Sequence, residues 1–431
     1  MEPAAEDCMG GIRLSGILIR GLHRLEGEIR IQGSKNAVLP VMAASLLHKG
    51  TVILENVPKI QDVFCMMGIL ESLGCICRWK EHTLTIRTDG LDGSRIPEVE
   101  ARKMRSSIML MGPLLGRMNE VIGWYPGGCS IGERPIDLHL AAFQAMGAEI
   151  FCDGDRITAV TEGLAGTDID LQFPSVGATE NVIMAAAAAE GVTTLYGAAR
   201  EPEIECLCLF LQEMGVRIEG TGSSMLRIHG GCELHDVTFR VPGDRIVAGT
   251  YLGAILAAGG DVFLKDAPTV HLSEVLDAAG QMGGEFEILP DGIRLRMEGR
   301  PRPIALKTGV YPGFPTDLQS VFVAAAAVAD GTSFISEHVF EGRFASAKEL
   351  RKLGGHIIIK DRTVCVEGIY PLSGGELTAP DLRGGAALVV AGLAARGETR
   401  VSGYEHIRRG YEDICRDLRG AGADIEYMDF R

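Results

Sequence analysis

The sequence of 431 residues contains no apolar stretch that approaches the length of a membrane-spanning helix. Its Ala-rich runs, such as 183–189 and 321–329, fall well short of the roughly 18 residues that a span requires. The N-terminus is acidic and lacks the basic region that opens a signal peptide. These absences predict a cytoplasmic protein that does not bind a membrane.

Positive charge is scarce in this chain. Lys and Arg number 42 against 57 Asp and Glu, which gives a formal net charge of −15. A nucleic-acid partner is disfavoured, because proteins that bind nucleic acids normally present a basic face. An anionic substrate would also be repelled by this excess, unless Arg and Lys gather locally around it.

The cysteines do not form a disulfide or zinc pattern. There are eleven, an odd number, and they are scattered along the chain. The pairs Cys75/Cys77 and Cys206/Cys208 are C-x-C and differ from the C-x-x-C spacing that is usual for zinc. We therefore expect these four to be structural thiols, and we expect no metal and no other cofactor.

One pattern recurs along the chain: an amphipathic segment ends in a Leu-Gly, Met-Gly or Ala-Gly pair and a short strand follows. The six glycines are spaced 73, 68, 68, 71 and 68 residues apart and are Gly74, Gly147, Gly215, Gly283, Gly354 and Gly422. Such regularity marks copies of one supersecondary unit, here of the order βαβαββ. The sequence thus predicts an α/β protein with two domains of three repeats each, one at residues 35–242 and the other at 1–34 together with 243–431.

The first helix of each copy begins with polar or charged residues. These starts are Lys35-Asn36, Arg105-Ser106, Thr179-Glu180, Asp244-Arg245, Asp317 and Asp381 to Arg383. N-capping explains the Asp, Asn, Ser and Thr residues. It does not explain the cations, because Lys or Arg opposes the positive end of the helix dipole. Helix N-termini combined with cations form anion sites, so an anionic ligand is the prediction and simple capping is the alternative.

The second copy carries a few extra residues, which fall in the segment 124–135. Insertions confined to one copy tend to lie in loops on the binding face of a repeat protein. Glycines surround Cys129 here, so the segment could be a mobile lid over an active site. Arg134 could lower the pKa of the thiol. The alternative is a surface loop with an incidental cysteine.

At this point the chain resembles the UDP-N-acetylglucosamine enolpyruvyl transferase (MurA) family. Eight phrases carry the resemblance, in order over about 380 residues: Gly33–Ala37, Pro126–Gly132, Arg134–His139, Ser175–Thr179, Arg200–Glu203, Phe314–Asp317, Asp381–Arg383 and Arg409–Glu412. The resemblance implies an inside-out α/β barrel in two domains, with the active site in the cleft between them.

The resemblance also implies a reaction. The enolpyruvyl group of phosphoenolpyruvate moves to the 3′-hydroxyl of UDP-N-acetylglucosamine by addition and elimination, and phosphate is released. This is the first committed step of peptidoglycan synthesis. Cys129 is then the acid that protonates C3 of the donor and can also attack C2, Asp317 is the base near the sugar hydroxyl, and Lys35 is catalytic. Taken alone, Asp317 would more readily be a helix N-cap.

The ligand sets follow from the same phrases. The residues implied to bind phosphoenolpyruvate are Lys35, Asn36, Arg134 and Arg409. The residues implied to bind the nucleotide sugar are Arg105, Arg134, Pro135, Ile136, Asp137, Leu138, Ser175, Val176, Gly177, Asp317 and Val339. Supporting site residues are Glu201, Asp244, Arg343, Asp381 and Arg383. Arginine suits these anionic groups because its planar fork donates two parallel hydrogen bonds.

Two other functions remain open. The 5-enolpyruvylshikimate-3-phosphate synthases share the implied fold and donor but use another acceptor, and the segment around Cys129 and the phrase Arg134–Leu138 favour the nucleotide sugar. A silent paralogue that only binds UDP-N-acetylglucosamine is the second alternative, and the presence of Lys35, Cys129, Asp317 and Arg409 argues against it.

Overall fold

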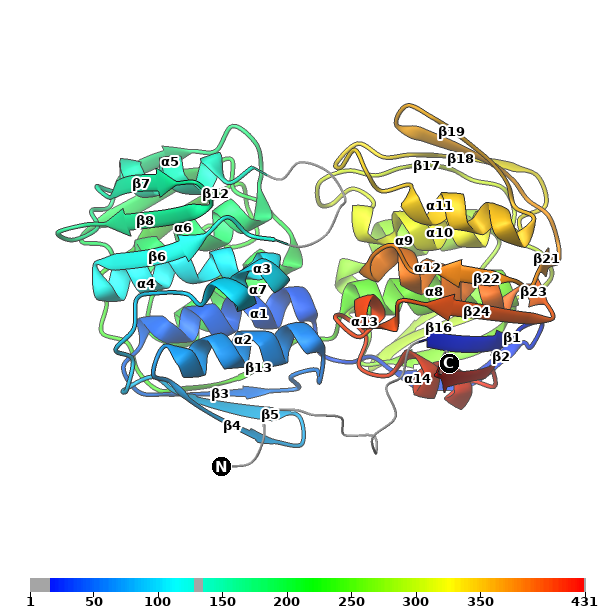
Figure 1. Cartoon of the computed structure of the whole chain (residues 1–431), viewed down its shortest axis with the longest axis horizontal. Helices are drawn as coiled ribbons and strands as arrows, with labels where there is room; N and C mark the ends of the chain where they lie inside the picture. Colours follow the sequence, from blue (N-terminus) through cyan, green and yellow to red (C-terminus); the bar gives the residue numbers. More distant parts are fainter. Residues whose placement is uncertain (1–15, 128–134, 430–431) are drawn as a thin grey trace. The chain divides into compact units, whose positions relative to one another are not determined.

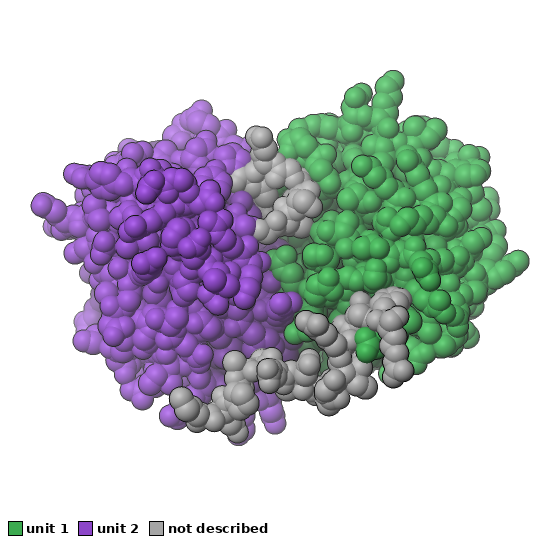
Figure 2. Space-filling model, viewed as in Figure 1, with its two compact units in different colours: residues 1–32, 130–133, 243–431 green, residues 33–129, 134–242 purple. Residues whose placement is uncertain are grey.

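The computed structural model describes residues 16–127 and 135–429. Within these residues the chain forms two compact units, one of residues 16–32 with 243–429 and the other of residues 33–127 with 135–242 (Figure 2). Each unit repeats a single sheet-and-helix pattern three times (Figure 1).

The sheets of the second unit all follow one scheme, in which an antiparallel three-stranded ribbon receives a parallel segment at one edge. Their orders are β13 (Val237–Arg240), β3 (Thr51–Glu55), β5 (Thr83–Arg87), β4 (Ile76–Lys80); β6 (Glu120–Trp124), β8 (Arg156–Val160), β7 (Glu149–Asp153); and β9 (Asp168–Asp170), β10 (Val192–Tyr196), β12 (Met225–His229), β11 (Arg217–Glu219). Beside β6, the parallel segment is reduced to a bridge between Arg95 and Ile122.

The first unit uses the same scheme with strands from both ends of the chain. The orders are β2 (Leu25–Arg30), β14 (Gly260–Lys265), β16 (Gly292–Met297), β15 (Glu285–Leu289); β17 (Ala305–Lys307), β18 (Thr332–Ser336), β20 (Thr363–Glu367), β19 (His356–Lys360); and β22 (Glu376–Thr378), β24 (Glu398–Ser402), β1 (Gly16–Arg20), β25 (Asp424–Met428). A small pair joins β21 (Leu372–Ser373) to β23 (Ala395–Arg396). The expected βαβαββ order is confirmed in this arrangement.

Each repeat has one inner helix and one or two outer helices. The inner helices are α1 (Lys35–Ala44), α4 (Met111–Met118) after η2 (Arg105–Leu110), α6 (Val176–Ala188), α8 (Arg245–Ala258), α10 (Gln319–Ala326) after η4 (Thr316–Leu318), and α12 (Leu382–Leu393). The others are α2 (Gln61–Ser72), α3 (Glu98–Lys103), α5 (Asp137–Ala145), α7 (Pro202–Glu213), α9 (Ser273–Gln281), α11 (Ala345–Leu350), α13 (Tyr404–Ile407) and α14 (Ile414–Gly420), with short turns η1 (Ser45–Leu47), η3 (Thr269–His271) and η5 (Arg351–Leu353).

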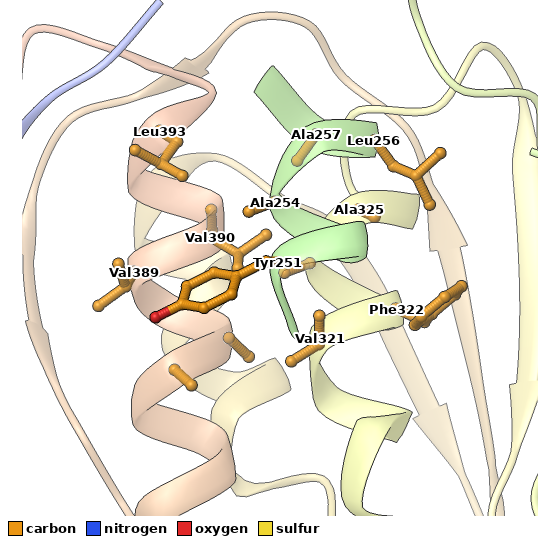
Figure 3. Close-up of a cluster of buried hydrophobic side chains, with 14 of the residues drawn as sticks. Tyr251, Ala254, Leu256, Ala257, Val321, Phe322, Ala325, Val389, Val390 and Leu393 are labelled. Atoms are coloured by element: carbon orange, nitrogen blue, oxygen red, sulfur yellow. The ribbon is translucent and has the colours of Figure 1, made fainter. Parts of the chain in front are cut away.

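The inner helices are mostly apolar and largely buried, as helices in the middle of a core must be. In α12 all twelve residues are buried, and α8, α10 and α12 pack on one another, with Tyr251, Val321 and Val390 among the buried side chains there (Figure 3). Glycine allows the close approach, because a Cβ on Gly253 would lie 2.3 Å from Val321 Cγ1. The sheets cover the outside of the helices, so the expected inside-out α/β architecture is confirmed.

The six landmark glycines share one backbone conformation. Their φ angles lie between 89° and 115°, the region that a Cβ penalises. Each therefore closes a helix in the way the repeat predicts. One expected boundary was wrong: α6 begins at Val176 and not at Thr179, because Ser175 caps it by accepting a hydrogen bond from Ala178 N at 3.4 Å. No helix in the described part of the chain is long and apolar enough to cross a membrane.

Candidate active site

Two of the predicted site residues, Cys129 and Arg134, lie outside the described residues. The others fall into two groups. Asp244, Asp317, Val339, Arg343, Asp381, Arg383 and Arg409 belong to the first unit, and Lys35, Asn36, Arg105, residues 135–138, residues 175–177 and Glu201 belong to the second.

Asp317 is held by two buried arginines. Its Oδ1 accepts a hydrogen bond from Arg343 Nη2 at 2.6 Å, and its Oδ2 lies 3.2 Å from Arg383 Nη2. It makes no N-cap contact with α10, whose cap position is Leu318 with no side-chain bond. The capping alternative is therefore wrong for this residue, and its carboxylate is placed instead at the centre of a cationic cluster.

The cluster has hydrogen-bonding capacity to spare. Arg343 and Arg383 are only 9% and 5% exposed. Arg343 Nε and Arg383 Nη1 are buried and have no hydrogen-bond partner among the described residues. Burial disfavours the charge of Arg383, yet Asp317, Tyr411 and Asp244 outweigh it and raise its pKa, so the guanidinium stays charged. A buried N–H without a partner is costly, so the site is suited to an anionic ligand.

Two further acids of this unit fix the arginines in place. Asp244 caps α8 by accepting from Ile246 N at 2.8 Å and Val247 N at 3.0 Å. Asp381 caps α12 by accepting from Arg383 N at 3.0 Å. These two acids are therefore N-caps, as the alternative predicted. By capping α8 and α12 they fix the helix starts at which Arg245 and Arg383 lie.

Gln32 binds the backbone directly after Arg409 through both atoms of its side-chain amide. Gln32 Nε2 donates to Gly410 O at 3.1 Å, and Gln32 Oε1 accepts from Glu412 N at 2.8 Å. Tyr411, between these contacts, is buried; its ring lies 5.9 Å from the guanidinium carbon of Arg383 and its hydroxyl lies 2.7 Å from Thr250 Oγ1. The backbone that carries Arg409 is thus anchored next to the arginine cluster.

In the second unit, Lys35 begins α1, and Ser34 caps that helix. The Lys35 ammonium lies 2.7 Å from Asp62 Oδ2 on α2, and the two side chains are 11% and 4% exposed. Sequence reasoning missed Asp62, since an acid in the first turn of a helix is ordinarily explained by the helix dipole. Here the acid fixes the position of a buried cation.

The segments predicted to bind the nucleotide sugar meet at Asn181. Its Nδ2 donates to Ile108 O at 3.0 Å and to His139 Nδ1 at 2.8 Å, and its Oδ1 accepts from Gly112 N at 2.9 Å. Because a backbone N–H can only donate, Gly112 identifies the amide oxygen, so His139 Nδ1 is the acceptor. A Cβ on Gly177 would lie 3.2 Å from His139. Three segments therefore lie together: residues 175–177, η2, which begins at Arg105, and α5, which follows residues 135–136.

His139 should make stability depend on pH. Burial, with the positive charge of Arg105 as a second cause, lowers its pKa from 6.5 to about 4. Between these values the unfolded chain binds a proton that the folded chain refuses, so stability is complete above pH 6.5 and falls as the pH drops toward 4. The loss reaches at most about 3 kcal/mol.

Urea unfolding measures this loss between pH 7.5 and 4.5. The free energy of unfolding of His139→Gln should decline less steeply than that of the unmodified protein. His23→Gln, at an exposed position, should keep the full decline, and equal slopes for all three would contradict the assignment.

Glu201 belongs to an acidic group that the sequence did not reveal. It occupies the N-cap position of α7, where its side chain makes no capping bond. Burial, followed by the charges of Glu203 and Glu201, raises the pKa of Glu180 well above its usual range. Its surroundings therefore favour the neutral, protonated form of the Glu180 carboxyl.

Comparison with known proteins identifies the family. The profile described as EPSP synthase (3-phosphoshikimate 1-carboxyvinyltransferase) matches residues 19–418. Two curated relatives are named UDP-N-acetylglucosamine 1-carboxyvinyltransferase: number 1 of Halalkalibacterium halodurans is 45% identical over 95% of this chain and 94% of its own length, and number 2 of Carboxydothermus hydrogenoformans is 43% identical over 95% and 98%. The chain belongs to the UDP-N-acetylglucosamine 1-carboxyvinyltransferase family. The resemblance seen in the sequence is confirmed.

Solved structures agree with a family of enolpyruvyl transferase fold. The enolpyruvyl transferase NikO from Streptomyces tendae superposes with a TM-score of 0.86 at 24% identity and covers 96% of this chain and 98% of its own. EPSP synthase from Acinetobacter baumannii gives 0.73 at 19% identity and covers 96% and 100%. At these identities the likeness bears on the fold alone.

Proposed function

We propose that this UDP-N-acetylglucosamine 1-carboxyvinyltransferase family member transfers the enolpyruvyl group of phosphoenolpyruvate to the 3′-hydroxyl of UDP-N-acetylglucosamine, in the cytoplasm. The relatives at 43–45% identity support this acceptor. The observation that carries the proposal within the structure is the pair of buried arginines around Asp317, since their spare N–H groups suit an anionic donor.

The transfer takes two steps. Asp317 accepts the proton of the 3′-hydroxyl while the oxygen forms a bond to C2 of the donor, and Cys129 gives a proton to C3. In the second step C3 gives a proton back to the Cys129 thiolate, the double bond between C2 and C3 re-forms, and the bond between C2 and the phosphate oxygen breaks, so that phosphate leaves and takes up the proton held by Asp317. A general base must lie within hydrogen-bond reach of the proton that it accepts.

Cations bind the donor in this proposal. Lys35, Asn36, Arg134 and Arg409 take the carboxylate and the phosphate, and each charge-assisted hydrogen bond contributes about 1.5–3 kcal/mol. Arg343 and Arg383 have a double role, because they orient Asp317 and keep N–H groups available for an anion. The segments joined at Asn181 take the nucleotide sugar.

The acceptor decides the assignment experimentally. Phosphate release from phosphoenolpyruvate should require UDP-N-acetylglucosamine and should not occur with shikimate 3-phosphate. Turnover with shikimate 3-phosphate alone would assign the chain to the other acceptor. Tight binding of the nucleotide sugar without turnover would indicate a silent paralogue.

Fosfomycin should modify one cysteine. We expect a single covalent adduct at Cys129, since the proposed pocket combines a reactive thiolate with cations that suit a phosphonate. Burial raises the pKa of the Cys75 thiol to about 11 and of the Cys206 and Cys208 thiols to about 12, so these remain protonated and slow to react.

Intact-mass analysis measures the adduct. Cys129→Ser should remove it, whereas Cys152→Ser, at an exposed cysteine, should leave it unchanged. An adduct that persists in Cys129→Ser would remove Cys129 from the proposed role.

A further inference from the structure

Two neighbouring turns in the first unit follow parallel strands. β17 and β18 pair in parallel, with Lys307 opposite Ser336. Since parallel strands end at the same edge of a sheet, the chain segments that leave them lie together. Thr308 N donates to Ser336 O at 2.9 Å, and Thr308 Oγ1 accepts from His338 N at 2.9 Å. The segment after β17 leads to Asp317, and the segment after β18 carries Val339 and Arg343.

Glu337 connects these two segments. It is completely buried. Its Oε2 accepts a hydrogen bond from the Thr316 hydroxyl at 2.8 Å, and its Oε1 accepts from Val339 N at 2.7 Å and Phe340 N at 3.0 Å. A carboxylate inside a protein is tolerated only when such donors satisfy it, so this side chain fixes both turns at once.

The connection continues into the arginine cluster. The guanidinium carbon of Arg343 lies 5.1 Å from the ring centre of Phe340, and Arg343 Nη2 lies 2.6 Å from Asp317 Oδ1. Asp317 directly follows Thr316, which Glu337 binds. The contacts therefore form a closed circuit from Asp317 through Thr316, Glu337 and the 339–343 segment and back to Asp317.

We propose that Glu337 is a positioning residue for the transfer reaction. Through Thr316 it sets the orientation of the Asp317 carboxylate, and through the backbone of residues 339–340 it sets the Val339 segment that is proposed to bind the nucleotide sugar. The base and the acceptor site thus share one buried anchor. This inference rests on the proposed function, in which Asp317 takes the proton of the sugar hydroxyl.

A pair of substitutions at Thr316 isolates the anchor. Thr316→Val keeps the branched shape and removes the hydroxyl, whereas Thr316→Ser keeps the hydroxyl. Because a displacement of about 1 Å can cost a hundredfold in rate, we expect Thr316→Val to lower kcat by about 10- to 100-fold. The KM for phosphoenolpyruvate should change less than threefold, and Thr316→Ser should keep a kcat within about threefold of the unmodified protein. Equal kcat values for Thr316→Val and the unmodified protein would overturn the proposal.

A double-mutant cycle tests whether Thr316 acts through Glu337. Glu337→Gln keeps the size of the side chain but places an amide nitrogen, which cannot accept a hydrogen bond, at one of the two oxygen positions. If both residues act through one bond, Thr316→Val combined with Glu337→Gln should cost far less than the product of the two single effects. Multiplied effects would mean that the Thr316 hydroxyl acts independently of Glu337, and the proposal would be wrong.

Amide hydrogen exchange provides a measurement that does not depend on turnover. Thr316→Val should speed exchange in residues 314–318, and Thr316→Ser should not. If the two variants differ in this way but the unmodified protein has no activity with UDP-N-acetylglucosamine, the proposed function is refuted and the anchor remains supported. Unchanged exchange in Thr316→Val would refute the anchor itself, whatever the activity.

Discussion

Asp317→Asn should lower kcat by about two to four orders of magnitude, the usual contribution of a positioned general base. The amide has the size of the carboxylate but cannot accept the proton of the sugar hydroxyl. UDP-N-acetylglucosamine should still bind to the variant, since its other proposed contacts are unchanged. Steady-state kinetics and calorimetric titration with the nucleotide sugar separate the two effects.

The same substitution should also reduce stability. Arg343 and Arg383 would face a neutral amide in place of the carboxylate that now lies 2.6 and 3.2 Å from them. Removing one partner of a buried ion pair costs about 3–5 kcal/mol in other proteins, and Asp317 is partly exposed, so a smaller loss is expected here. A bound anion should restore part of it.

Asp330→Asn is the matched control. Asp317 precedes helix α10 and Asp330 follows it. Asp330 is paired with Arg300 at 3.0 Å and has a side chain that is 78% exposed. We expect its kcat and its stability to stay close to those of the unmodified protein. A kcat in Asp317→Asn within threefold of this control would rule out Asp317 as the base.

The repeats could be predicted because a conformation that favours glycine recurs at the same point of each copy. A helix that must end in a left-handed turn selects glycine, and six such turns at regular intervals reveal six copies. The inner helices could also be predicted, because a helix that is buried on all sides is mostly apolar on all sides. The start of α6, expected at Thr179, lies one turn earlier, since the capping residue Ser175 is followed by several other polar residues that could also begin a helix.

The residues that position the site could not be predicted in this way. Asn181 contacts Ile108 and Gly112 across 73 and 69 residues, and Glu337 contacts Thr316 across 21. A buried polar residue is recognisable only when its partners are known, and those partners depend on tertiary packing. Local rules also gave the wrong alternative for Asp317 and the right one for Asp244 and Asp381, although all three acids stand beside helix starts.

Lys35→Met should lower kcat/KM for phosphoenolpyruvate by at least about 100-fold. A charge-assisted contact contributes about 1.5–3 kcal/mol, and an ammonium proposed to bind the donor would make more than one such contact. The variant should also lose about 3–5 kcal/mol of stability, because Asp62 loses the cation that lies 2.7 Å away. Kinetics at varied phosphoenolpyruvate and urea unfolding measure the two losses, and Lys49→Met, at an exposed lysine, should show neither.

A second substitution separates the structural part of Lys35 from its chemical part. Replacing both members of a buried ion pair by apolar groups is often neutral for stability, whereas removing one member is not. Lys35→Met combined with Asp62→Leu should therefore regain most of the stability lost in Lys35→Met while its kcat/KM for phosphoenolpyruvate stays low. If activity returned together with stability, Lys35 would be needed only to neutralise Asp62. Persistent inactivity in a stable double variant would mean that the ammonium itself acts on the donor, and Asp62 would then be the residue that holds it in place.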